Sequence, residues 1–136
     1  MMSPKEIVKN FYESDLANDS SVVSTYIHKD CVLHWNSSTG YRIFNYDDLD
    51  EFFKNIKVAY HALRPQISHL LQDQNRVTIR YTMFVSTIED PENELPLANF
   101  ISIWEIKDGK LYRGYEISQV ADDNIESYKS FSEIKV

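Results

Sequence analysis

Most residues from 66 to 120 belong to one of four segments with strand character. These segments cover residues 66–71, 76–89, 95–107 and 110–120, and short polar turns separate them. The last turn, Asp108-Gly109, is typical of a tight hairpin. Strands of about 11 to 14 residues are long compared with the usual five or six, and long antiparallel strands twist and curl. We therefore expect a strongly bent antiparallel sheet.

The first half of the chain predicts three helices and two strands. Ser3, Pro4 and Glu6 form a capping pattern at the start of the first helix, and an apolar stripe continues to Leu16. A short helix near residues 22–27, strands at 31–36 and 41–44, and a third helix at about 46–63 follow. The order ααββαββββ predicts an α+β fold in which helices cover the concave face of the sheet. Such a cone encloses a pocket.

Composition excludes several classes of function. Fourteen basic and 21 acidic residues give a net charge of −7, which disfavours nucleic acid and anionic membranes as partners. Three glycines cannot build a phosphate-binding or dinucleotide-binding loop. One cysteine, Cys31, permits no internal disulfide, and the four histidines lack metal-ligand spacing. We therefore expect no cofactor and no metal. The start of the chain lacks an apolar signal segment, so we expect a cytoplasmic protein.

The chain resembles the NTF2-like superfamily, which is also called cystatin-like, and in particular its SnoaL-like and ketosteroid-isomerase-like bacterial branch. Four segments in a fixed order carry the resemblance: IVKNFY (7–12), YIHKDCVLHW (26–35), DDLDEFF (47–53) and IWEIKDGKLYR (103–113). The resemblance implies a single domain over residues 1–120 and a C-terminal tail over 121–136. In the tail, Ile125, Tyr128, Phe131 and Ile134 recur at a spacing that is compatible with a short helix.

The resemblance implies the fold strongly and the activity weakly, because this fold hosts isomerases, cyclases, epoxide hydrolases, dehydratases and binding modules. Ketosteroid isomerases of this fold use a tyrosine on the first helix and aspartates on the first and fifth strands. Phe11, Trp35 and Ile101 occupy the corresponding places here. The resemblance therefore implies that isomerase chemistry of that type is absent.

Strand alternation, placed by this resemblance, predicts which side chains enter the pocket. Glu116 is then the one carboxylate in an apolar cavity, where burial raises the pKa of the carboxyl group and makes it a candidate general acid or base. The alternative is that Glu116 lies on an exposed face or pairs with Arg113 or Arg80. The predicted pocket lining comprises Phe11, Trp35, Phe53, Ile56, Ile79, Tyr81, Met83, Asn99 and Ile101.

The outer face of the predicted sheet carries Phe84, Phe100 and Trp104, with Tyr115 and Ile117 beside them. Apolar patches of this kind usually mark an interface, and many relatives dimerise sheet to sheet. We therefore expect a homodimer through Phe84, Phe100 and Trp104.

The leading hypothesis is a homodimeric NTF2-like protein that binds a small, largely apolar molecule in a conical cavity. One alternative is a SnoaL-like lyase, isomerase or hydrolase that uses Glu116 as general acid or base. Another is a noncatalytic protein-interaction module that uses the outer sheet face. The position of Glu116 relative to the cavity separates the first two.

Overall fold

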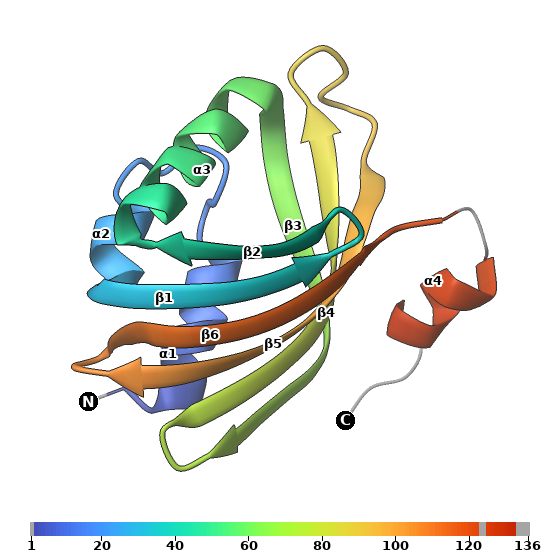
Figure 1. Ribbon diagram of the computed structural model, residues 1–136. Coiled ribbons are helices and arrows are strands. Elements are labelled where there is room, and N and C mark those ends of the chain that lie inside the picture. Colours follow the sequence, from blue (N-terminus) through green and yellow to red (C-terminus); the bar gives the residue numbers. More distant parts are fainter. Residues whose placement is uncertain (1, 123–124, 133–136) are drawn as a thin grey trace.

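The computed structural model describes residues 2–122 and 125–132 (Figure 1). Four helices are present, α1 (Pro4–Glu13), α2 (Val22–Tyr26), α3 (Tyr46–Ala59) and α4 (Ile125–Ser132). The six strands are β1 (Ile27–Ser37), β2 (Gly40–Asn45), β3 (Tyr60–Asp73), β4 (Arg76–Thr87), β5 (Leu95–Lys107) and β6 (Lys110–Val120). The predicted order of elements is confirmed through β6.

The strands form one bent, unclosed sheet in the order β2-β1-β6-β5-β4-β3. β1 and β6 are parallel, and the other neighbouring pairs are antiparallel. The sheet curls around α1 and α3, whereas α4 lies outside the curl (Figure 1). The predicted α+β cone with helices on its concave face is therefore confirmed.

Helix starts follow the capping chemistry in the sequence. The Ser3 Oγ accepts a hydrogen bond from the backbone N–H of Glu6 (3.2 Å), and Pro4 occupies the first turn of α1. Asn45 and Asp48 form a reciprocal capping box at the start of α3, with donor–acceptor distances of 2.9 and 3.0 Å.

The end of α3 differs from the expectation. The helix was predicted to continue to Leu63, but it ends at Ala59, and β3 begins at Tyr60. Tyr60 pairs with Thr87, and Leu63 pairs with Val85, so this segment forms ladder contacts that a helix would forfeit. Pro65 is tolerated within β3 because β3 is an edge strand.

β5 presents the face opposite to the predicted one. Ala98, Phe100, Ser102 and Trp104 point toward the helices, and Ile101 and Ile103 remain on the outer surface with exposed fractions of 40% each. A shift of one residue along a strand exchanges all of its side chains between faces. Ladder irregularities at Met83/Phe84 and at Glu105/Ile106 bracket this part of β5.

The close approach of Trp104 to Gly114 favours the observed face. The two residues are direct cross-strand partners. A Cβ atom on residue 114 would lie 2.6 Å from a Trp104 ring carbon and 2.7 Å from Leu33 Cδ1. The missing side chain of Gly114 thus provides the space in which the indole lies.

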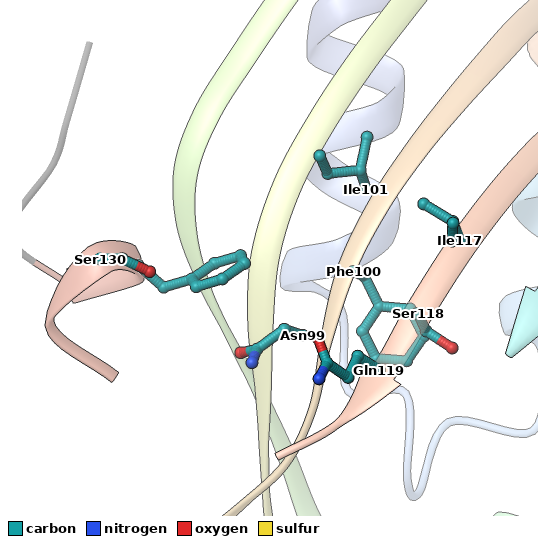
Figure 2. Close-up of a pocket in the computed structure, with 8 residues that line it drawn as sticks. Asn99, Phe100, Ile101, Ile117, Ser118, Gln119 and Ser130 are labelled. Carbon is teal, nitrogen blue, oxygen red and sulfur yellow. The ribbon is translucent and has the colours of Figure 1, made fainter. Parts of the chain in front are cut away.

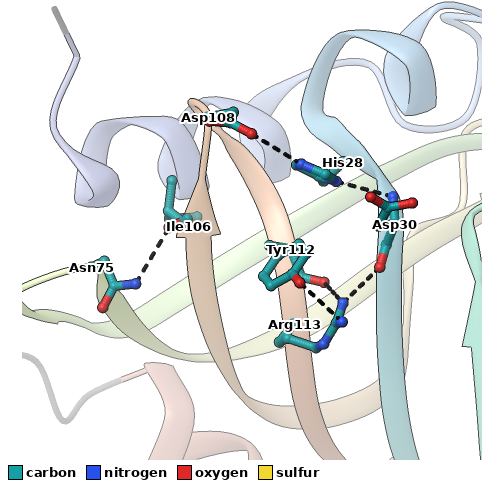
Figure 3. A network of polar contacts seen from close by, with 7 residues as sticks. All are labelled: His28, Asp30, Asn75, Ile106, Asp108, Tyr112 and Arg113. Carbon is teal, nitrogen blue, oxygen red and sulfur yellow. Dashed lines mark hydrogen bonds and ion pairs between the residues drawn. The ribbon is translucent and has the colours of Figure 1, made fainter.

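A bulge in β1 is held by side chains from β6 and the preceding turn (Figure 3). Residues 28–31 of β1 lie opposite Tyr112 alone, because the ladder shifts between Ile27 and Val32. Arg113 Nη1 donates to the backbone oxygen of Asp30 (2.6 Å). His28 Nδ1 accepts from the Asp30 backbone N–H (3.0 Å), which leaves the Nε2 proton to reach Asp108 Oδ2 (3.2 Å). These bonds replace ladder bonds that the bulge removes.

α4 packs on the outer face of the sheet beside β3 and β4. The Arg80 guanidinium lies 3.7 Å from the centroid of the Phe131 ring, and its Nη1 donates to the Ser130 backbone oxygen (3.2 Å). Ile134, which shares the predicted spacing of the tail, lies outside the described residues.

Replacing Gly114 with Ala is expected to destabilise the fold. The added methyl group overlaps the Trp104 indole and Leu33, and overpacking of this kind costs about 1–3 kcal/mol. Urea unfolding measures the loss, with the exposed Gln119→Ala on the same strand as a control. A Gly114→Ala protein as stable as the unaltered one would contradict the role given to this glycine.

Candidate functional site

A cavity of about 290 Å³ lies between the concave face of the sheet and helices α1 and α3. Its wall is largely aromatic and aliphatic. An apolar cavity of about 150 Å³ accommodates benzene, so this one accommodates a molecule of about two fused rings. The lining residues are Phe11, Tyr12, Leu16, Leu33, Trp35, Phe44, Leu49, Phe52, Phe53, Ile56, Tyr60, Leu63, Tyr81, Met83, Leu97, Phe100, Trp104 and Glu116.

Glu116 and six of the nine predicted lining residues lie in this wall. The six are Phe11, Trp35, Phe53, Ile56, Tyr81 and Met83. Ile79 is fully buried in the core next to the cavity and does not line it.

Asn99 and Ile101 do not enter the cavity, which corrects the prediction. They line a separate depression on the outer face, between β5, β6 and α4, together with Ile117 and Gln119 (Figure 2). Asn99 Oδ1 accepts a hydrogen bond from the outer-face hydroxyl of Thr82 (2.7 Å). Asn99 and Ile101 lie outside the cavity because β5 turns its even-numbered residues, Phe100 and Ser102, toward the helices.

The face that β5 presents also corrects the predicted dimer residues Phe100 and Trp104, and Phe84 on β4 is buried as well. Trp104 is only 3% exposed and lies in the cavity wall, and the Phe100 ring stacks on Tyr81 at 4.9 Å. Phe84 is 6% exposed, and the Arg64 guanidinium covers its ring at 4.5 Å. Phe84, Phe100 and Trp104 therefore form no exposed outer patch.

Glu116 is the only acidic residue among the described residues that line the cavity. It lies on β6 between Gly114 and Ser118 and is half-buried, with part of its side chain facing the cavity space. Burial among protein atoms raises the pKa of Glu116 to about 7, although a hydrogen bond from Ser102 acts in the opposite direction. A carboxyl group with that pKa exchanges protons readily near neutral pH.

Neither arginine that was considered as a partner pairs with Glu116. Arg113 bonds to the Asp30 backbone and to Tyr112. Arg80 bonds to the Ser68 hydroxyl and to the Ser130 backbone oxygen. Neither arginine therefore opposes the effect of burial on the Glu116 carboxyl group.

Tyr12 and Trp104, which line the polar end of the cavity, and Ser102, which is buried beside Glu116, were not among the predicted site residues. The Ser102 hydroxyl donates to Glu116 Oε1 (2.6 Å), and Trp104 Nε1 donates to the Tyr12 hydroxyl (2.9 Å). Burial raises the pKa of Tyr12 and of Tyr81 above their ordinary value, so both remain protonated donors at neutral pH. The signal for Tyr12 was its place beside Phe11 on the buried stripe of α1. The positions of Ser102 and Trp104 could be predicted only with the correct inward face of β5.

The first helix therefore does supply a tyrosine to the cavity. Phe11 and Tyr12 both line it, and the Tyr12 hydroxyl reaches the polar end near Glu116. Phe11 occupies the place of the isomerase tyrosine on the first helix, and the adjacent Tyr12 supplies a hydroxyl that was not predicted there. Trp35, at the second of the compared places, donates through Nε1 to Ser118 (2.8 Å).

Within residues 2–122 and 125–132, no group of three or more His, Cys, Asp and Glu side chains could hold a metal ion. No helix in these ranges is long and apolar enough to cross a membrane.

Comparison with known proteins gives a consistent family. Residues 8–114 match the family model described as a SnoaL-like domain. No curated protein matches the chain.

Solved structures with the same fold are numerous. IdmH from Streptomyces antibioticus, a candidate polyketide cyclase, is 15% identical with a TM-score of 0.68, over 91% of this chain and 94% of that one. An LEH-like epoxide hydrolase from M. tuberculosis is 12% identical with a TM-score of 0.67, over 96% and 90% of the two chains. A candidate SnoaL-like polyketide cyclase from Jannaschia sp. CCS1 is 9% identical with a TM-score of 0.64, over 95% and 91%. At these identities the likeness establishes the fold alone.

The raised pKa of Glu116 predicts a pH-dependent gain from Glu116→Gln. In the unfolded chain the carboxyl loses its proton near its ordinary pKa of about 4.3, whereas in the folded protein it keeps the proton up to about pH 7. Stability of the unaltered protein therefore falls as the pH rises between these values and stays reduced above pH 7. Glu116→Gln removes this penalty, so its advantage should grow from about pH 4.3 to pH 7, up to about 3 kcal/mol.

Urea unfolding at a series of pH values measures this advantage. Glu51→Gln, at an exposed site on α3, serves as the control for removing an acidic side chain from the surface. A Glu116→Gln advantage that is absent at pH 8 would show that the carboxylate is well solvated.

Proposed function

Since the chain belongs to the SnoaL-like family, we propose that its cavity binds a small, largely apolar molecule of about two fused rings. The observation that carries this proposal is the aromatic and aliphatic cavity with a polar group at one end. Pockets of this composition gain affinity from apolar burial, while a few polar groups fix the orientation of the ligand. Glu116, Tyr12 and Tyr81 supply those polar groups here.

Catalysis in the same cavity is the second function, and the position of Glu116 favours it. A half-buried carboxyl with a pKa near 7 is suited to remove a proton from carbon and return it. The neighbouring tyrosine hydroxyls remain protonated and can donate to an oxygen of the ligand. In this proposal Glu116 is the general acid and base.

An outer-face homodimer is also proposed, through residues different from those first expected. The exposed apolar side chains of the central outer face are Ile101, Ile103, Tyr115 and Ile117, of which Ile117 is 60% exposed. They are contiguous across β5 and β6, because Ile101 pairs with Ile117 and Ile103 with Tyr115. α4 covers the neighbouring β3–β4 part of this face. The β5–β6 part is therefore the proposed interface with a second copy.

Binding and catalysis can be tested together with 2-tetralone, an apolar two-ring ketone with acidic hydrogens beside its carbonyl. We expect calorimetry to detect binding to the unaltered protein. Ile56→Trp fills the cavity and should abolish binding, whereas Ile101→Trp on the outer face should preserve it. Equal binding by both variants would remove the cavity from the proposal.

The catalytic part predicts faster exchange of those hydrogens for deuterium, followed by NMR. The protein-dependent rate should rise with pH up to about 7 and then level off, because the ionised carboxylate is the base. Glu116→Gln should lower the protein-dependent exchange rate at least tenfold. The dissociation constant measured by calorimetry should change by no more than a few-fold. Retained binding with unaccelerated exchange in the unaltered protein would favour a binding protein.

The dimer proposal predicts a mass of twice 16.0 kDa by light scattering at micromolar concentration. Ile117→Glu places a charge in the centre of the proposed interface and should give a monomer. Leu71→Glu, at an exposed site on β3, should remain a dimer. A monomeric unaltered protein would overturn the dimer and favour the outer face as a seat for a different protein.

A further inference from the structure

One oxygen of Glu116 is already engaged by the protein. The Ser102 side chain is fully buried, and its Oγ lies 2.6 Å from Glu116 Oε1. Within the described ranges, Ser102 is the one side chain that hydrogen-bonds to Glu116. The two oxygens of the carboxyl group are therefore not equivalent.

A second hydrogen bond lies beside this contact. Trp104 is two residues from Ser102 on the same face of β5, and its indole N–H donates to the Tyr12 oxygen at 2.9 Å. The Tyr12 hydroxyl, having accepted from Trp104, keeps its own proton for another acceptor in the cavity. The Ser102 proton is directed to Glu116 Oε1.

We propose that Ser102 is a positioning residue that reserves Oε2 of Glu116 for the ligand. Oε1 accepts the Ser102 hydrogen bond in both protonation states, so the exchangeable proton of Glu116 is carried on Oε2. This inference rests on the acid–base role proposed for Glu116.

The proton balance of the step is simple. When Glu116 removes a proton from the ligand, a carbon–hydrogen bond breaks, an O–H bond forms at Oε2, and the electron pair stays on the ligand. Ser102 keeps its own O–H bond throughout. Returning the proton from Oε2 to carbon restores the carboxylate, so the step requires no further reactant.

The test is the titration of Glu116 by carboxyl carbon NMR in the unliganded protein. Ser102→Ala removes the hydrogen bond that favours the ionised form, so the titration midpoint should rise by about one pH unit above that of the unaltered protein. The pH dependence of 2-tetralone exchange should shift by the same amount.

Ser118→Ala is the matched control. Ser118 follows Glu116 by two residues on the same face of β6. Its hydroxyl accepts a hydrogen bond from Trp35 Nε1 (2.8 Å) and makes no hydrogen bond to the Glu116 carboxyl group. This variant should leave the Glu116 midpoint unchanged. If Ser102→Ala does not fold, the nearly isosteric Ser102→Cys should give a smaller upward shift.

The outcomes separate this inference from the proposed function. A raised midpoint in the unaltered protein that Ser102→Ala and Ser102→Cys leave unmoved would overturn the positioning role and leave Glu116 as the acid–base group. A midpoint near that of a free glutamate in the unaltered protein would overturn the acid–base function. If the midpoint of the unaltered protein is ordinary but that of Ser102→Ala is higher, the contact between Ser102 and Glu116 would still be supported.

Discussion

The contact between the Trp104 indole and the bare backbone of Gly114 determines which face of β5 lines the cavity. With the indole on that side, Ser102 and Phe100 follow on the same face, two and four residues away. The same placement brings Trp104 Nε1 to Tyr12 and Ser102 to Glu116. The polar end of the cavity therefore depends on a glycine that carries no chemistry of its own.

The cavity combines an apolar wall with a small polar cluster whose members are all uncharged or weakly acidic at neutral pH. Within the described cavity wall no cationic side chain accompanies Glu116. A strongly anionic ligand would lack a partner there, and a charged carboxylate is itself disfavoured. The wall thus favours neutral ligands with one polar end. Burial makes the proton on Glu116 available near neutral pH, which links the binding and catalytic parts of the proposal.

The order of elements and the location of Glu116 could be predicted from the sequence because each had a strong local signal. Capping residues marked the helices, Asp108-Gly109 marked the hairpin, and alternation on β6, placed by the family resemblance, put Gly114, Glu116 and Ser118 on the inward face. β5 offered no such signal, since Phe100 and Trp104 compete with Ile101 and Ile103 for the interior. Alternation alone is then ambiguous, and the ladder irregularities near Met83 and Ile106 that accompany the observed face have no marker in the sequence. Ser102 lies on β5 and was missed for the same reason.

The parallel pairing of β1 with β6 has a consequence for how the protein is made. Trp35 lies opposite Glu116, so the ladder that joins them closes a loop containing most of the chain. β2, β1 and α3 are synthesised early, yet β1 finds its second neighbour only after β6 has been synthesised. Contacts of such long sequence separation form slowly because the loop entropy is lost before the contacts form. Until β6 has been synthesised, β1 cannot complete its pairing, and the aromatic residues of the future cavity leave the nascent chain prone to aggregation.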